Sequence, residues 1–261
     1  MEKPIVLVVH GAWHRASHYT KLVEPLREAG YTVVVPALPS AGSEPPTANH
    51  TLDDDIETIQ SAIQPFMDAG RELVAVLHSY GGIPGTDSVV GHTIQDRRSK
   101  GLRGGVKAVI YIAAFAPPAP ATSLFDMVRI KDESDPHPDW WTPKESELLK
   151  HVTDGLVSLN EGARHALYQD IDIEVADEAL ASTVKQSTAS FKQKCSHAAG
   201  TIMAHKTYVA CQQDAAVPYE GQVFMAEAAG ANVVALDCGH SPFLKDEESA
   251  KLVAIIAGIS V

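Results

Sequence analysis

The sequence has few cysteines and no long apolar run. Its three cysteines, Cys195, Cys211 and Cys238, are too few and too widely spaced for a disulfide framework, which favours a reducing compartment. No apolar stretch approaches the roughly 18 residues of a membrane span, and the N-terminus lacks the charged-then-apolar layout of a signal peptide. We therefore expect a cytoplasmic protein with no membrane partner.

Positive charge is also scarce. Lys and Arg number 21 against 33 Asp and Glu, which gives a formal net charge of -12. A surface of this sign repels phosphate backbones, so we expect no nucleic-acid partner. No phosphate-binding glycine loop is present, and His14 and His18 lack the glutamate of a zinc-binding H-E-x-x-H pattern. We expect no cofactor and no metal, and the sequence leaves the choice between monomer and dimer open.

What the chain does contain is an alternation of apolar strands and helices over residues 1–116 and 207–261. The runs Ile5–Val9, Leu73–Leu77 and Val106–Ile112 are continuously apolar, which is typical of parallel strands buried on both faces. Further elements are expected as follows: strands at Tyr31–Val35, Thr207–Cys211 and Asn232–Leu236, and helices from Ser17 to Ala29, after Thr51 or Asp53, at Tyr219–Ala229 and at Asp246–Ala257. This pattern predicts an α/β fold, a mostly parallel sheet with helices on both faces.

Residues 117–206 interrupt the alternation. They are punctuated by prolines, then helical in pattern, with no clear strand. An insertion between two sheet strands indicates a mainly helical cap over the carboxyl edge of the sheet, placed before the strand Thr207–Cys211. We therefore expect one core, residues 1–116 and 207–261, and a cap insertion, residues 117–206. A second polar stretch, Gly91–Gly105, is expected to be a solvated loop or a short helix.

The stretch AVLHSYGG, residues 75–82, carries the first chemical signal. Chemistry in an open parallel sheet belongs at the carboxyl ends of the strands, and Ser79 follows such a strand. Gly81 supplies the small residue that a sharp strand-to-helix turn needs, and the segment matches G-x-S-x-G except that Leu77 replaces the first glycine. This pattern alone is weak, and a serine that caps a helix is the alternative.

A serine hydroxyl needs a base to become a nucleophile, and the base needs an acid to orient it. The last predicted strand is followed by His240, and the strand before it by Asp214. Because the carboxyl ends of parallel strands meet at one edge, we expect both residues near Ser79. Asp237 is the alternative acid, but it lies only three residues before His240, so its side chain would have to turn back along its own loop.

An acyl-transfer site also needs two backbone N–H groups that face the developing oxyanion. We expect these from Tyr80, directly after the serine, and from Ala12, in the loop after the first strand. Gly11 lets that loop approach closely, and His10 is expected to brace it. Substrate contacts are expected from Gly11 and Trp13, and from Trp140 and Trp141 in the cap, although aromatic residues in a cap more often form its own small core.

Together these segments resemble the α/β-hydrolase superfamily, especially its group of methylesterases, hydroxynitrile lyases and cofactor-independent hydrolases. The matching segments are VHGAWH (9–14), GYTVVVPALPSAG (30–42), HSYGG (78–82), CQQDAAVP (211–218) and CGHSPF (238–243). The resemblance implies an α/β-hydrolase fold with the triad in the chain order Ser79, Asp214, His240. Leu77 departs from the family glycine and implies repacking at the turn.

The resemblance also bears on the reaction. Hydroxynitrile lyases of this group carry a threonine and a lysine where this chain has Gly11 and Ser241. The sequence therefore predicts a serine hydrolase that cleaves a small to medium hydrophobic ester, lactone or thioester through an acyl-enzyme on Ser79. The alternatives are a lyase, of the hydroxynitrile or retro-aldol type, another non-hydrolytic reaction on the same triad, and an inert ligand-binding member of the fold.

Overall fold

The computed structural model describes residues 2–130, 138–141 and 155–260. Six parallel strands form the main sheet in the order β2-β1-β4-β5-β8-β9. Their bounds are β1 Ile5–Val9, β2 Val33–Val34, β4 Glu72–His78, β5 Gly105–Ile112, β8 His205–Cys211 and β9 Asn232–Leu236. The predicted class is confirmed: a parallel sheet with helices on both faces.

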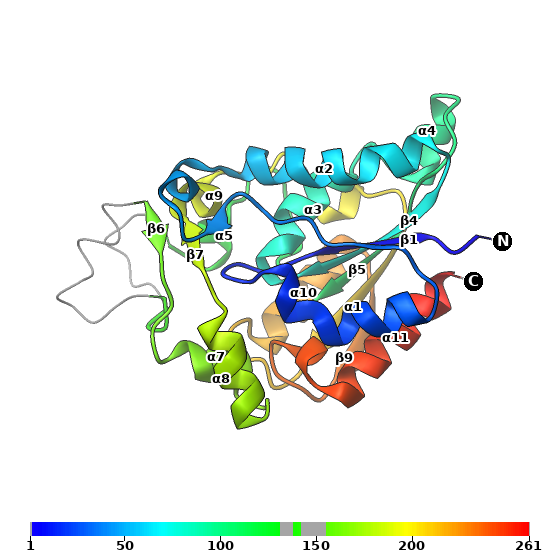
Figure 1. Cartoon of the computed structure of the whole chain (residues 1–261). Coiled ribbons are helices and arrows are strands. Elements are labelled where there is room, and N and C mark those ends of the chain that lie inside the picture. Colours follow the sequence, from blue (N-terminus) through cyan, green and yellow to red (C-terminus); the bar gives the residue numbers. More distant parts are fainter. Residues whose placement is uncertain (1, 131–137, 142–154, 261) are drawn as a thin grey trace.

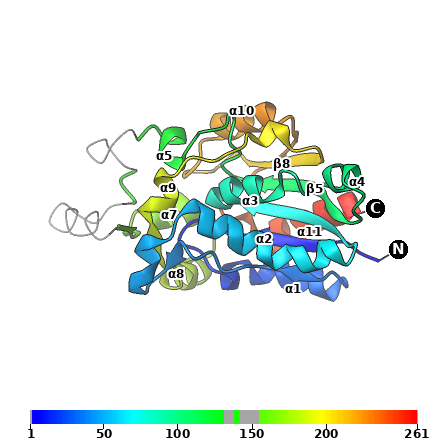
Figure 2. The ribbon, with the colours of Figure 1, turned by 90° about the horizontal axis from the view of Figure 1, so that it is seen from above.

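Alternate side chains of the strands feed two separate apolar cores. Ile5, Leu7 and Val9 pack with α2, α3 and α10, whereas Val6 and Val8 pack with α1 and α11. These helices and a shorter one are α1 Thr20–Glu28, α2 Leu52–Asp68, α3 Gly82–Val89, α4 Ile94–Ser99, α10 Tyr219–Ala229 and α11 Asp246–Ser260. Figure 1 shows α1 and α11 on one side of the sheet with α2 and α3 on the other, and in Figure 2 α2, α3 and α10 cover the near face.

Two local expectations are wrong in their bounds. Ser17 does not cap α1, because a 3-10 turn, η1 (Ala16–Tyr19), precedes the helix, and the side chain of His18 accepts the N–H of Arg15 instead. The strand expected at Tyr31–Val35 is only Val33–Val34, since β1 pairs with it over just two residues. The choice at α2 falls on Thr51, which is the N-cap and shares a reciprocal capping box with Asp54.

The 117–206 segment is mainly helical, but the expectation of no strand in it is wrong. Its described elements are α5 Leu124–Met127, β6 Leu156–Val157, α7 Ala163–Tyr168, α8 Ile173–Ala181, β7 Lys185–Ser187, α9 Thr188–Lys192 and η4 Ala199–Thr201. Strand β7 pairs antiparallel with β6 and with β3 (Ala41–Gly42). Strands of two or three residues leave no period in the sequence. The segment gathers at the carboxyl end of the main sheet (Figure 1).

The polar stretch Gly91–Gly105 forms the short helix α4. Within the three described ranges, none of the helices combines the length and the apolar composition needed to cross a bilayer.

Candidate active site

Ser79 lies at a sharp turn between β4 and α3. Its φ of 51° is the left-handed conformation that a non-glycine residue adopts only under constraint. Three residues on, the backbone enters α3 through the turn η3 (Ser79–Gly81). A Cβ on Gly81 would lie 2.6 Å from the carbonyl oxygens of both Val9 and His10, so only glycine fits there. The turn thus presents the Ser79 hydroxyl at the edge of the sheet.

Leu77, the departure from the family glycine, is accommodated by a second glycine. Its side chain is fully buried and packs against the backbone of Gly85 on α3, where an added Cβ would lie 2.4 Å from Leu77 Cδ2. A larger residue in the strand is therefore matched by a missing side chain in the helix. This is the repacking that the resemblance implied.

The structure brings the three expected catalytic side chains into one hydrogen-bonded run. Ser79 Oγ lies 3.0 Å from His240 Nε2, and His240 Nδ1 lies 2.8 Å from Asp214 Oδ2. All three residues are buried. Asp237, the alternative acid, instead accepts a bond from Gln213 at the surface. The side chains come from the loops after β4, β8 and β9, as the sheet order requires.

Asp214 is itself held by the loop after β8. Its Oδ1 accepts the backbone N–H groups of Ala216 and Val217 at 2.8 and 2.9 Å, and its Oδ2 accepts the Gln222 amide at 3.1 Å. Gln222, on α10, also bonds the backbone of Cys211 through its Oε1 at 2.9 Å. These donors fix the orientation of the Asp214 side chain and leave its Oδ2 facing His240 Nδ1.

The loop after β1 is held by bonds on every side. Gly11 donates its N–H to the Tyr19 hydroxyl at 2.8 Å. Trp13 has a φ of 61° and donates its N–H to Gln186 Oε1 at 3.3 Å, while its carbonyl accepts the Val184 N–H at 2.9 Å. Ala12 lies between these two anchored residues and faces the same cavity as Ser79. The 117–206 segment thus fixes the loop in which we expect an oxyanion donor.

His10 braces this loop, as the sequence predicts. Its Nδ1 donates to the Gly11 carbonyl at 2.9 Å, and its Nε2 accepts the Leu38 N–H at 3.1 Å. Burial lowers the pKa of His10 to about 4, so the ring is neutral at physiological pH. A neutral ring with one donor and one acceptor satisfies both contacts.

The cavity beside Ser79 is small and almost wholly apolar. Its volume is about 30 Å³, room for only about one or two waters. It is lined by Ala12, Trp13, Ser79, Tyr80, Phe115, Leu124, Val128, Pro138, Trp140, Trp141, Ala216, Val217 and His240. Trp13, Trp140 and Trp141 are thus placed where substrate contacts are expected. Gly11 does not line the cavity, because it lies against the side chains of His78 and Ser79.

A buried carboxylate next to the serine turn escaped the sequence reasoning. Asp55, on α2, is fully buried and accepts the Tyr80 hydroxyl at 2.7 Å and both the N–H and the hydroxyl of Ser40. Burial raises the pKa of Asp55 to about 6. In the sequence it is one of three consecutive aspartates at a helix start, a run that usually indicates a solvated first turn.

The loop that carries His240 is contacted from the 117–206 segment as well. Asp170 accepts the N–H of Gly239 at 2.8 Å and also pairs with Lys245 at 3.0 Å. Its neighbour Gln169 donates to the carbonyl of Gln213, in the loop of the acid. A Cβ on Gly239 would lie 2.4 Å from Asp170 Oδ1, so a larger residue there would displace the Asp170 side chain from this contact.

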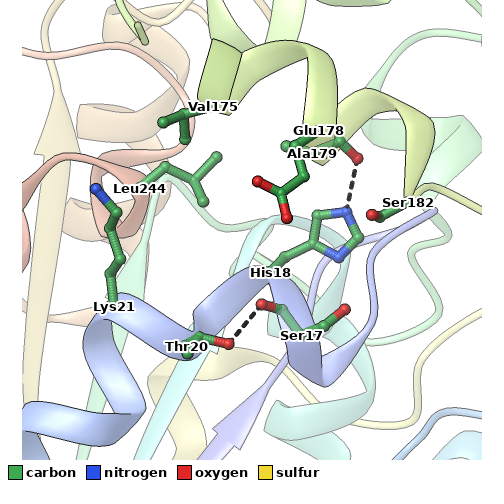
Figure 3. Close-up of a pocket in the computed structure, with 9 residues that line it drawn as sticks. All are labelled: Ser17, His18, Thr20, Lys21, Val175, Glu178, Ala179, Ser182 and Leu244. Atoms are coloured by element: carbon green, nitrogen blue, oxygen red, sulfur yellow. Dashed lines mark hydrogen bonds between the residues drawn. The ribbon is translucent and has the colours of Figure 1, made fainter.

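A second cavity lies away from these residues, between η1, α1 and α8. Its volume is about 280 Å³. Figure 3 shows His18 at its wall, with its Nε2 directed to the Ala179 carbonyl, and Lys21 and Glu178 on opposite sides. None of the three expected catalytic residues lines it.

In the part of the chain that is described, no three His, Cys, Asp or Glu residues gather as metal ligands.

The fold and this arrangement of strand ends define the class of protein. The chain belongs to the alpha/beta hydrolase family, which it matches over residues 5–254. Alpha/beta hydrolase nvfD of Aspergillus novofumigatus is 31% identical over 252 residues, 95% of this chain and 94% of that protein. Salicylic acid-binding protein 2 of Nicotiana tabacum is 24% identical over 242 residues, 86% of this chain and 84% of that protein.

Solved structures agree on the fold. Polyneuridine aldehyde esterase superposes with a TM-score of 0.73 at 19% identity, covering 98% of this chain and 100% of that one. The α/β-hydrolase fold and the likeness to methylesterase-like members, both expected from the sequence, are confirmed.

Proposed function

We propose that this hydrolase cleaves carboxylic esters through an acyl-enzyme on Ser79. The supporting observation is the run from Asp214 through His240 to Ser79, with bonds of 2.8 and 3.0 Å. A carboxylate at Nδ1 fixes the proton there and leaves the Nε2 lone pair facing the hydroxyl. That tautomer is the one able to remove the serine proton.

The proposed reaction has two halves. Ser79 Oγ attacks the ester carbonyl while its proton passes to His240 Nε2, and the negative oxygen is held by the N–H groups of Ala12 and Tyr80. His240 then protonates the departing alcohol, which leaves an acyl group on Ser79. A water that gives its proton to His240 attacks this acyl group, and the reverse transfer frees the serine.

We propose the 117–206 segment as the cap of this site, with residues 1–116 and 207–261 as the core. The segment supplies Trp140 and Trp141 to the cavity wall, where their rings pack against Trp13 of the core. The apolar lining favours a small to medium hydrophobic ester, lactone or thioester. Hydroxynitrile lyases of the resembled group carry threonine and lysine where this chain has Gly11 and Ser241. This difference favours hydrolysis over cyanohydrin cleavage.

A cytoplasmic location belongs to the same proposal. Cys195, Cys211 and Cys238 are all buried free thiols. Unpaired thiols are usual in a reducing compartment.

The experiment is hydrolysis of a graded series of aryl and alkyl esters, with labelling by a fluorophosphonate probe. Ser79→Ala should lose both labelling and roughly 10⁴-fold or more in kcat. Ser88→Ala is the matched control: Ser88 is buried on α3 and donates to the Pro84 carbonyl at 2.7 Å, away from the cavity. If wild type hydrolyses no ester but labels, and releases aldehyde or cyanide from cyanohydrins, a lyase is favoured. If the wild type neither hydrolyses esters, nor reacts with the probe, nor cleaves cyanohydrins, a ligand-binding member of the fold is favoured.

A further inference from the structure

Two buried histidines outside the triad contact the loops that carry the reaction. His14 and His78 are respectively 1% and 0% exposed. Their ring centroids lie 5.7 Å apart, and the ring of His78 lies 4.8 Å from that of His240. Burial lowers the pKa of both well below the usual value, so both rings are neutral. Each neutral ring has one donor nitrogen and one acceptor nitrogen to place.

The contacts of His78 fix its tautomer. Its Nε2 lies 3.0 Å from the backbone carbonyl of His240, which can only accept, so Nε2 carries the proton. Its Nδ1, 2.7 Å from the Tyr19 hydroxyl, then accepts from that hydroxyl. The Tyr19 oxygen in turn accepts the Gly11 N–H at 2.8 Å. One continuous run of bonds therefore joins the loop after β1 to the loop of the catalytic base.

The contacts of His14 fix the opposite tautomer. Its Nδ1 lies 2.7 Å from the Ala12 carbonyl, so the proton is on Nδ1. Its Nε2 accepts from the Tyr168 hydroxyl, on α7, at 2.9 Å. The peptide between Ala12 and Trp13 is thereby held at its carbonyl by His14 and at its N–H by Gln186. This fixes the backbone of Ala12, the expected oxyanion donor.

We propose that His14 and His78 are positioning residues of the reaction, neutral rings of opposite tautomer that hold the Ala12 loop and the His240 loop in register with Ser79. The inference rests on the proposed function, because the proposed function makes Ala12 the oxyanion donor and His240 the base. Neither ring touches the substrate cavity, so their effect is on the placement of the oxyanion donor and of the base.

The test exchanges each ring for an amide that keeps one nitrogen. Asparagine places its amide nitrogen where Nδ1 of histidine lies, and glutamine places it where Nε2 lies. His14→Asn should therefore exceed His14→Gln in kcat, and His78→Gln should exceed His78→Asn, each by about tenfold or more. KM should differ by less than about threefold within each pair, because no substrate contact is changed.

A role in filling space alone gives a different result. Glutamine is the larger amide, so a packing role ranks the two amides in the same order at both positions, and that ranking would overturn the inference. Equal kcat within each pair would do so as well. Urea unfolding checks that all four variants fold. Where one does not, Tyr168→Phe replaces the test at His14 and Tyr19→Phe the test at His78. Each removes one hydroxyl and should lower kcat while leaving KM within about threefold.

The two proposals fail separately. A wild-type protein that neither hydrolyses esters nor reacts with the fluorophosphonate removes the proposed function and this inference with it. A wild-type protein that does both, but whose variants show no reversal of rank between positions 14 and 78, removes this inference alone.

Discussion

The buried neutral histidines make the free energy of unfolding depend on pH. His10 has a pKa of about 4 in the folded chain against 6.5 when exposed. Above pH 6.5 the ring is neutral in both the folded and the unfolded chain, so it does not make the free energy of unfolding depend on pH. As pH falls from 6.5 toward 4, the unfolded chain takes up a proton that the folded chain does not. Stability is therefore lost over this window.

The magnitude follows from the two pKa values of His10. Between pH 7 and pH 5 this residue alone should lower the free energy of unfolding by about 2 kcal/mol. His14 and His78 act in the same direction, since burial lowers both pKa values. Asp55 acts in the opposite direction: its raised pKa of about 6 means that the folded chain takes up this proton first, which offsets about 1 kcal/mol. His10 and Asp55 together therefore give a fall of about 1 kcal/mol, to which His14 and His78 add.

Urea unfolding at pH 7 and pH 5, followed by tryptophan fluorescence, measures this difference. His10→Asn keeps a donor toward the Gly11 carbonyl and should reduce the pH dependence by about 2 kcal/mol. Asp55→Asn removes the opposing group and should make the loss at pH 5 larger by about 1 kcal/mol. A free energy of unfolding that is equal at the two pH values, or higher at pH 5, refutes the reasoning, because it means that the folded chain accepts these protons.

Three further outcomes follow from single contacts. Gly239→Ala places a Cβ 2.4 Å from Asp170 Oδ1, and kcat should fall by about tenfold or more. The double variant with Asp170→Ala should recover part of this loss. Steady-state kinetics of the wild type, the single variant and the double variant measures both effects. Gly85→Ala should destabilise by about 1–3 kcal/mol, by overpacking against Leu77; in urea unfolding, the double variant with Leu77→Ala should lose less than the two single losses combined. Trp141 lines the cavity, and its buried indole N–H has no partner among the described residues, so we expect it to be available to a polar group of a bound substrate. Trp141→Phe should therefore lower by about fivefold the kcat/KM preference for an ester with a methoxy group in its acyl part over its ethyl analogue.

The meeting of Ser79, Asp214 and His240 could be predicted from the sequence, because the parallel sheet places all three. A parallel sheet brings all its carboxyl strand ends to one edge, so an apolar run followed by a polar residue identifies both the residue and its location. Ser79, Asp214 and His240 each follow such a run. The same logic indicates why Asp237 was the weaker candidate: it shares a strand end with the histidine that it would have to orient.

The residues that hold the loop after β1, next to Ser79, could not be predicted in this way. Gln186 meets Trp13 and Tyr168 meets His14 across more than 150 positions of sequence, from the short elements β7 and α7. A buried polar residue gives no pattern of its own, because its partner is decided only when the chain packs. His14 and His18 show the difficulty. Their spacing of four fits one helix face, yet one lies in a loop and binds Ala12, and the other binds Arg15 and Ala179.

The 117–206 segment both lines the cavity and holds Trp13, and these two groups of residues are in contact. Trp140 and Trp141 line the cavity proposed to take the substrate, while Gln186 and the backbone of Val184 hold Trp13 in its left-handed conformation. The ring of Trp13 lies 5.5 Å from both of the other tryptophan rings. A substrate that shifts these rings therefore presses on the residue that follows Ala12. If Ala12 donates to the oxyanion as proposed, substrate shape affects the direction of that N–H, so selectivity among esters should appear in kcat as well as in KM.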